Sequence, residues 1–94
     1  MFKVMYRIGY TTRFKKDFKR CKKRGLDMSI LETVIELLRI NGNLPKIYKP
    51  HQLKGNYADC WECHLLSDWL LVWKQNDVEL VLLFTNTGTH SDLY

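Results

Sequence analysis

The sequence contains no long apolar run, and no window approaches the ~18 to 20 consecutive apolar residues of a membrane span. Its first ten residues alternate in character instead of forming an apolar stretch, so we expect no signal peptide. Proline and glycine are scarce, at two and five of 94 residues, and no repeat, linker or low-complexity segment divides the chain. These absences predict a single domain over residues 1–94, located in the cytoplasm and without a membrane partner.

Cysteine is also sparse, and three is an odd number, which indicates free thiols in a reducing compartment. The run Cys60-Trp61-Glu62-Cys63-His64 matches the C-x-x-C-H pattern of covalent haem attachment, but that chemistry belongs outside the cytoplasm. A zinc site is disfavoured because residues three apart on a strand point to opposite faces. We therefore expect no metal and no cofactor, and interpret both cysteines as small core or edge thiols.

Acidic residues are outnumbered, because 15 Lys and Arg against 10 Asp and Glu give a formal charge of +5. Much of the excess falls in one predicted helix whose single acid is Asp17. The plain interpretation is a solvated face, but such an imbalance is a poor solubility device and is typical of a phosphate-binding surface. The eight basic residues of this surface are Arg13, Lys15, Lys16, Lys19, Arg20, Lys22, Lys23 and Arg24.

In the first half of the chain, hydrophobic periodicity predicts one strand and two helices. Residues 3–10 alternate as a strand does, and a narrow apolar stripe at i, i+4 and i+7 predicts a helix over 13–24. Gly25 suits the end of that helix, and a second helix with a broad apolar stripe follows from about Asp27 to residue 40. Together the two helices form an αα-hairpin that needs a sheet to cover.

The second half predicts an irregular segment over 44–55 and then three strands, at 57–65, 69–74 and 79–85. Short polar turns separate the strands, so we expect an antiparallel meander. The predicted order is β-α-α-β-β-β, an α+β fold in which the αα-hairpin packs on one face of an antiparallel sheet. Alternation along the first of the three strands places Glu62 and His64 on the opposite, outward face.

Histidine occurs at three positions, His51, His64 and His90, each in a polar segment flanked by turns. A lone histidine is more often structural, but imidazoles suit proton transfer near neutral pH. The polar tail 85–94 is expected to fold back and join the other two histidines. With Asp68, a basic surface and exposed aromatic rings, they fit metal-independent RNA cleavage, in which the 2′-hydroxyl attacks the adjacent phosphate.

Four segments carry a recognisable pattern, and they are His51-Gln52-Leu53-Lys54-Gly55, Glu62-Cys63-His64, Ser67-Asp68-Trp69-Leu70-Leu71-Val72 and Thr87-Gly88-Thr89-His90-Ser91-Asp92-Leu93-Tyr94. Together they resemble the YafQ branch of the RelE-like toxins, and the resemblance covers nearly the whole domain. It implies a RelE-like fold and a type II toxin that cleaves mRNA in the ribosomal A site. It also implies a cognate, DinJ-like antitoxin, for which the positive charge of this chain favours an acidic toxin-binding segment.

The same resemblance implies roles for individual residues. Its acid–base positions match His51, His64, Asp68 and His90. We prefer His90 as the general acid and Asp68 or His64 as the base. Substrate contacts are expected from Trp69, Asn86, Tyr94 and Lys54, and contacts with RNA or the ribosome from the eight basic residues of the first helix.

Asn86 departs from the family pattern, which usually carries arginine four residues before the last histidine. Arginine suits bidentate phosphate contact and transition-state charge. Loss of one such stabiliser costs ~10²- to 10³-fold in rate, so the sequence predicts a weakened or inactive toxin. Lys49, Lys54 and Lys74 are candidates to supply the missing charge. The alternative function is a non-catalytic RNA- or antitoxin-binding module of the same fold.

Overall fold

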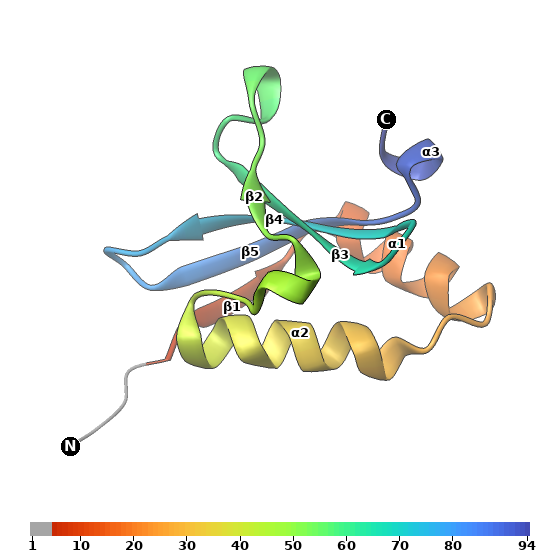
Figure 1. Ribbon diagram of the computed structural model, residues 1–94, viewed down its shortest axis with the longest axis horizontal. Helices are drawn as coiled ribbons and strands as arrows, with labels where there is room; N and C mark the ends of the chain where they lie inside the picture. Colours follow the sequence, from red (N-terminus) through yellow and green to blue (C-terminus); the bar gives the residue numbers. More distant parts are fainter. Residues whose placement is uncertain (1–4) are drawn as a thin grey trace.

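The computed structural model describes residues 5–94, which form one five-stranded sheet with helices against it (Figure 1). The strands, in the sheet order β1-β5-β4-β3-β2, are β1 (Arg7–Tyr10), β5 (Val81–Gly88), β4 (Trp69–Asn76), β3 (Cys60–Leu66) and β2 (His51–Gln52). The helices are α1 (Thr12–Lys23), α2 (Met28–Asn41) and the short α3 (His90–Leu93), with 3-10 turns η1 (Lys46–Tyr48) and η2 (Gly55–Tyr57). None of these helices combines the length and apolar character needed to cross a membrane.

The sheet is mixed, which corrects the expectation of a wholly antiparallel one. The predicted antiparallel meander of β3, β4 and β5 is confirmed. However, β1 pairs with β5 in parallel, with Arg7 opposite Val81, because the two helices and the meander carry the chain back to the same edge. The strand starts later than predicted, and residues 3 and 4 of that prediction lie outside the described part of the chain. A two-residue strand, β2, also forms within the segment expected to be irregular.

Both long helices begin and end close to the residues that the sequence predicts. The Thr11 hydroxyl accepts a hydrogen bond from the Phe14 N–H at 3.0 Å, which starts α1. Asp27 does the same for α2 through the Ser29 N–H at 3.0 Å. The second helix ends at Gly42, where φ is 70° and the Tyr6 ring fills the space that a Cβ would need.

The αα-hairpin covers one face of the sheet, as predicted (Figure 1). Within residues 5–94, no helix layer covers the opposite face, so its polar side chains are available to build a site. The core between the layers is made by Phe14, Cys21, Leu31, Val34 and Leu38 from the helices and by Cys63, Leu65, Trp69, Leu71, Trp73, Leu82 and Phe84 from the sheet.

Candidate functional site

One row of paired residues crosses the open face of the sheet over four strands. His51 on β2 pairs with Glu62 on β3, Glu62 with Val72 on β4, and Val72 with Asn86 on β5. Directly paired residues share a face and lie within side-chain contact distance. The fold therefore gathers an imidazole, a carboxylate and an amide from segments separated by up to 35 positions in the chain.

On this face, His64 is a neighbour of each of the other two histidines. The ring centroid of His64 is 6.3 Å from that of His51 and 6.1 Å from that of His90. His64 is opposite Leu70, which in turn pairs with Gly88 at the end of β5, and the chain reaches His90 two residues later. The expected return of the tail to the other two histidines is thus observed.

His90 is fixed by Asp68, which lies in the turn between β3 and β4. Its Nδ1 is 2.7 Å from Asp68 Oδ1, and its backbone N–H donates to the same oxygen at 3.1 Å. These hydrogen bonds hold the pKa of the Asp68 carboxyl below its usual range. An ionised Asp68 keeps the proton on Nδ1 and leaves Nε2 to face a substrate. Asp68 is consequently suited to orient His90 and is poorly suited to act as a base.

Glu62 lies on the predicted face but is not exposed, which corrects the expectation that it points to solvent. Glu62 is only 5% exposed, and both His51 and Tyr94 contact its carboxylate. The Tyr94 hydroxyl donates to Oε2, and His51 Nε2 lies 3.2 Å from Oε1. His51 Nδ1 is in turn 2.9 Å from the carbonyl oxygen of Lys49, so each ring nitrogen of His51 faces an oxygen atom. Burial, reinforced by the hydrogen bond to Glu62, raises the pKa of Tyr94.

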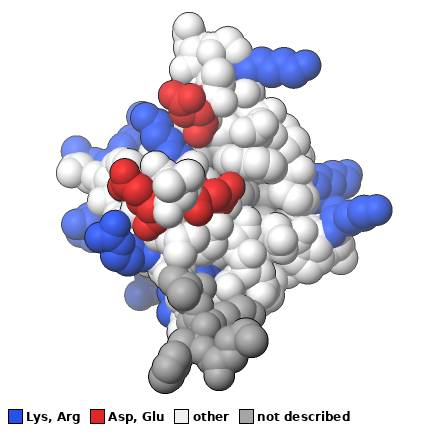
Figure 2. All heavy atoms as spheres, turned by 90° about the vertical axis from the view of Figure 1, so that its left-hand side faces the viewer, with Lys and Arg blue, Asp and Glu red and all other residues white. Residues whose placement is uncertain are grey.

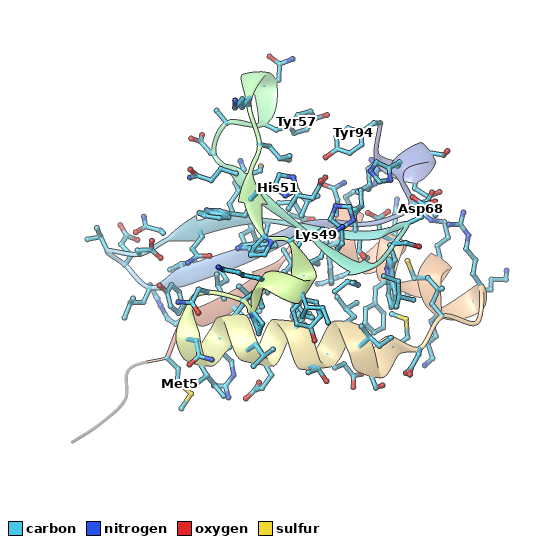
Figure 3. All side chains as sticks on the ribbon, in the orientation of Figure 1. Met5, Lys49, His51, Tyr57, Asp68 and Tyr94 are labelled. Carbon is cyan, nitrogen blue, oxygen red and sulfur yellow. The ribbon has the colours of Figure 1, made fainter. Side chains whose placement is uncertain are left out.

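Asn86, at one end of the row of paired residues, borders a small polar cavity of about 90 Å³. The Tyr94 ring meets the Tyr57 ring edge to face, with 6.0 Å between the centroids, and both lie above the sheet in Figure 3. The cavity is lined by Arg13, Tyr57, Val72, Asn86, Leu93 and Tyr94.

Comparison with known proteins identifies the family. The family described as "Bacterial toxin of type II toxin-antitoxin system, YafQ" matches residues 6–94. The chain belongs to the YafQ family. The resemblance inferred from the motifs and the RelE-like α+β fold are thereby confirmed.

Individual relatives agree with this assignment. The "mRNA interferase toxin YafQ" of Escherichia coli strain K12 is 38% identical over 89 residues, which cover 93% of this chain and 94% of that toxin. YafQ in the crystal structure of the E. coli DinJ-YafQ complex has a TM-score of 0.87 at 37% identity and covers 95% and 98% of the two chains. A metal-bound toxin from Helicobacter pylori also has a TM-score of 0.87, at 38% identity, with coverage of 96% and 100%.

In this member of the YafQ family, the C-terminal α3 is clamped to α1. Arg24 Nη1 donates to Asp92 Oδ2 at 2.6 Å, and Arg20 Nη2 lies 3.8 Å from the same oxygen. Asp92 also closes a capping box with Thr89. Arg24, together with the Thr89 backbone N–H, holds the pKa of Asp92 far below its usual range. The clamp fixes His90 and Tyr94, which flank it in sequence.

The buried Asp17 ties α1 to the last residues of β5. Its side chain is fully buried, and Oδ2 accepts the Thr87 N–H at 3.1 Å. Its Oδ1 lies 3.1 Å from Arg13 Nε and 3.0 Å from Arg20 Nη2. Sequence analysis missed this role, although an acid three residues after Phe14 on the apolar stripe was a usable signal.

The basic residues of α1 consequently divide into two groups. Arg13, Arg20 and Arg24 make ion pairs with Asp17 or Asp92 within the chain. The lysines remain exposed on the helix, and they are Lys15, Lys16, Lys19, Lys22 and Lys23. Figure 2 views the molecule from the end at which β4 turns into β5, where acidic side chains gather near the middle and basic ones lie at the periphery. That end therefore lacks the one-sign charge of the helix surface.

Trp69 does not occupy the position that the YafQ-family resemblance implied. It is 2% exposed in the core, and its indole N–H donates to Thr87 Oγ1 at 3.0 Å. The first residue of β4 points toward the helices, so the ring supports β5 and presents no face to a base. Lys54 is exposed at the start of η2, and Lys74 is exposed on β4.

Cys60 and Cys63 lie on opposite faces of β3, as the alternation predicts, and both are buried. Burial raises the pKa of the Cys63 thiol to about 12. The pair therefore cannot chelate one ion together, and within residues 5–94 there is no group of three or more His, Cys, Asp and Glu side chains arranged for a metal.

Proposed function

We propose that this chain acts as a single-domain endoribonuclease toxin that cleaves mRNA on the ribosome, in the cytoplasm, by metal-independent acid–base catalysis. Membership of a family whose curated relatives are mRNA interferase toxins supports the enzyme class. The observation that carries the mechanism is the pair of imidazoles at His64 and His90, 6.1 Å apart, with Asp68 hydrogen-bonded to the second.

His64 is the base in the proposed reaction, and His90 is the acid. His64 takes the proton from the 2′-hydroxyl, whose oxygen then forms a bond to the adjacent phosphorus. The bond from phosphorus to the 5′-oxygen breaks, and His90 protonates this leaving oxygen from Nε2. The products are a 2′,3′-cyclic phosphate and a free 5′-hydroxyl. Asp68 orients His90 for this step, since its carboxylate lies 2.7 Å from Nδ1 and leaves Nε2 for the leaving oxygen.

Substrate contacts in this proposal come from residues around His51, His64 and His90. Tyr94 and Tyr57 are 60% and 48% exposed, which suits stacking of their rings on splayed bases. Lys54 and the exposed lysines of α1 supply a positive surface for RNA or ribosomal phosphates. His51 orients Glu62 and Tyr94 and does not transfer the proton itself, because both of its nitrogens already face acceptors.

A cognate antitoxin of the DinJ kind is the proposed protein partner. The E. coli relative has been solved as a DinJ-YafQ complex. An acidic antitoxin segment would complement the five lysines on α1, which form no ion pair within residues 5–94 of this chain. Covering that surface would also keep RNA from the site.

The test is inducible expression in bacteria, followed by primer-extension mapping of mRNA cleavage. We expect growth arrest with cleavage inside open reading frames, abolished by His90→Ala. Ser91→Ala is the matched control, because the neighbouring exposed residue belongs to the same helix but not to the site. Where no other residue supplies the cation beside the reacting phosphate, Asn86→Arg should raise cleavage by up to ~10²- to 10³-fold.

Two results would contradict the proposal. Arrest that survives His90→Ala would place the chemistry elsewhere. RNA binding without cleavage, both in this chain and in Asn86→Arg, would instead favour the non-catalytic binding module, which the neutral Asn86 makes the second candidate.

A further inference from the structure

The site has a cation that sequence reasoning did not assign to it. Arg13 lines the same small cavity as Asn86 and Tyr94, although it comes from α1 at the other end of the chain. In sequence it is one member of a run of basic residues, so its particular placement could not be distinguished from that of its neighbours.

Two contacts position the Arg13 side chain and leave some of its N–H groups without a partner among them. Nε donates to the buried Asp17 at 3.1 Å, and Nη2 donates weakly to the Asp92 carbonyl oxygen at 3.4 Å. The side chain is still 55% exposed. A guanidinium has more N–H groups than these two contacts consume, so donors remain for an oxyanion in the cavity. Its anchoring also lowers the entropy lost when a ligand binds.

The lysines that the sequence offered as substitutes for the family arginine are less suited to this place. Lys74 lines a different cavity of about 320 Å³, together with Asp59 and Gln52. Lys49 and Lys54 are exposed in the segment around β2, and neither contributes to the wall of the cavity beside Asn86. Among the residues that line that cavity, Arg13 supplies the positive charge.

We propose that Arg13 binds the substrate phosphate at the Asn86 cavity and stabilises the charge of the phosphorane, a role that the family arginine would fill from β5. The inference rests on the proposed nuclease function. In this chain the cation therefore comes from Arg13 on α1 and not from position 86. The shorter Asn86 side chain leaves space in the cavity for the Arg13 guanidinium.

A double-mutant cycle tests this assignment, with cleavage measured under single-turnover conditions on purified ribosomes programmed with mRNA. Arg13→Ala should lower the cleavage rate by ~10²- to 10³-fold. Asn86→Arg in the Arg13→Ala background should restore much of the loss, whereas Lys46→Ala, an equal loss of charge at an exposed position outside the site, should change nothing. Loss of rate that Asn86→Arg fails to rescue would make Arg13 a purely structural residue and overturn the inference.

A binding measurement separates this inference from the nuclease function itself. The probe is a fluorescent RNA hexamer with 2′-O-methyl groups, which cannot be cleaved. Arg13→Ala should weaken its binding by at least ~10-fold relative to Lys46→Ala. Equal binding by the two variants would overturn the role of Arg13, even if the unmodified chain cleaves mRNA. The melting temperature of each variant is measured as well. Arg13→Lys keeps the positive charge, so its binding shows whether weaker binding by Arg13→Ala comes from the lost charge or from a lower stability of the fold.

Discussion

Replacing Asp17 by alanine should destabilise the protein more than any change of a surface charge. The carboxylate is fully buried, accepts hydrogen bonds from the Thr87 N–H and from Arg13 Nε, and forms an ion pair with Arg20. Alanine removes all three interactions and introduces no group that could replace them. The Thr87 N–H would then be a buried donor without a partner, at the strand end that precedes His90.

The expected cost can be built from these contacts. A buried donor left unsatisfied costs ~1–3 kcal/mol. The arginines can be hydrated when released, because the side chain of Arg13 is 55% and that of Arg20 is 35% exposed, so their share is reduced by solvent screening. Cavity formation and the lost ion pairs bring the sum to about 3–5 kcal/mol, the range known for breaking a buried pair. A loss of 3 kcal/mol lowers the melting temperature of such a domain by about 12–24 °C.

Thermal unfolding followed by far-UV circular dichroism measures this loss directly. Glu32→Ala is the matched control, because it also removes one negative charge from a helix, at an exposed position. We expect its melting temperature to stay within a few degrees of the unmodified protein. If Asp17→Ala also melts within about 4 °C of the unmodified protein, the contribution assigned to this carboxylate is wrong.

Three further outcomes follow from the tail and its contacts. Gly88→Ala should abolish cleavage while the helices remain folded, because φ is 155° there and an added Cβ would lie 2.7 Å from Asp92 Oδ2. Primer extension measures the cleavage, and far-UV circular dichroism of the protein measures the helix content. The lowered pKa of Asp92 contributes stability above pH ~3.9 that is lost as pH falls, so Asp92→Asn should reduce the melting temperature at pH 7 and flatten its decline between pH 5 and 2. The raised pKa of Tyr94 implies stability that is complete below pH ~10 and is lost above it, so Tyr94→Phe should lessen the fall in melting temperature on the alkaline side, and an unchanged fall would contradict the burial of its hydroxyl against Glu62.

The helices and the meander could be predicted because their signals are local. Thr11 and Asp27 cap the helices through hydrogen bonds that span two or three residues, and the apolar stripes fix the buried faces. Parallel pairing of β1 with β5 could not be predicted, since it joins residues more than 70 positions apart and depends on how the intervening elements pack. The short β2 forms only because β3 offers an edge beside it.

The sequence could name candidate site residues, but it could not predict their contacts. The resemblance carried the histidines and Asp68, which the fold indeed brings together. Alternation put Glu62 on the correct face, yet it could not reveal that His51 and Tyr94 cover the carboxylate. Trp69 was misassigned because a strand-terminal aromatic can point either way, and packing against Thr87 decided the direction.

The three buried thiols allow local opening of the structure to be measured by their reactivity. Cys21 lies on the buried face of α1, while Cys60 and Cys63 lie on the two faces of β3, and all three are almost fully inaccessible. An alkylating reagent can reach them only when that part of the structure opens, so the labelling rate at each position measures a local opening equilibrium. Mass spectrometry after a short pulse would thus show whether the helix that carries the lysines separates from the sheet before the sheet itself comes apart, with no engineered label required.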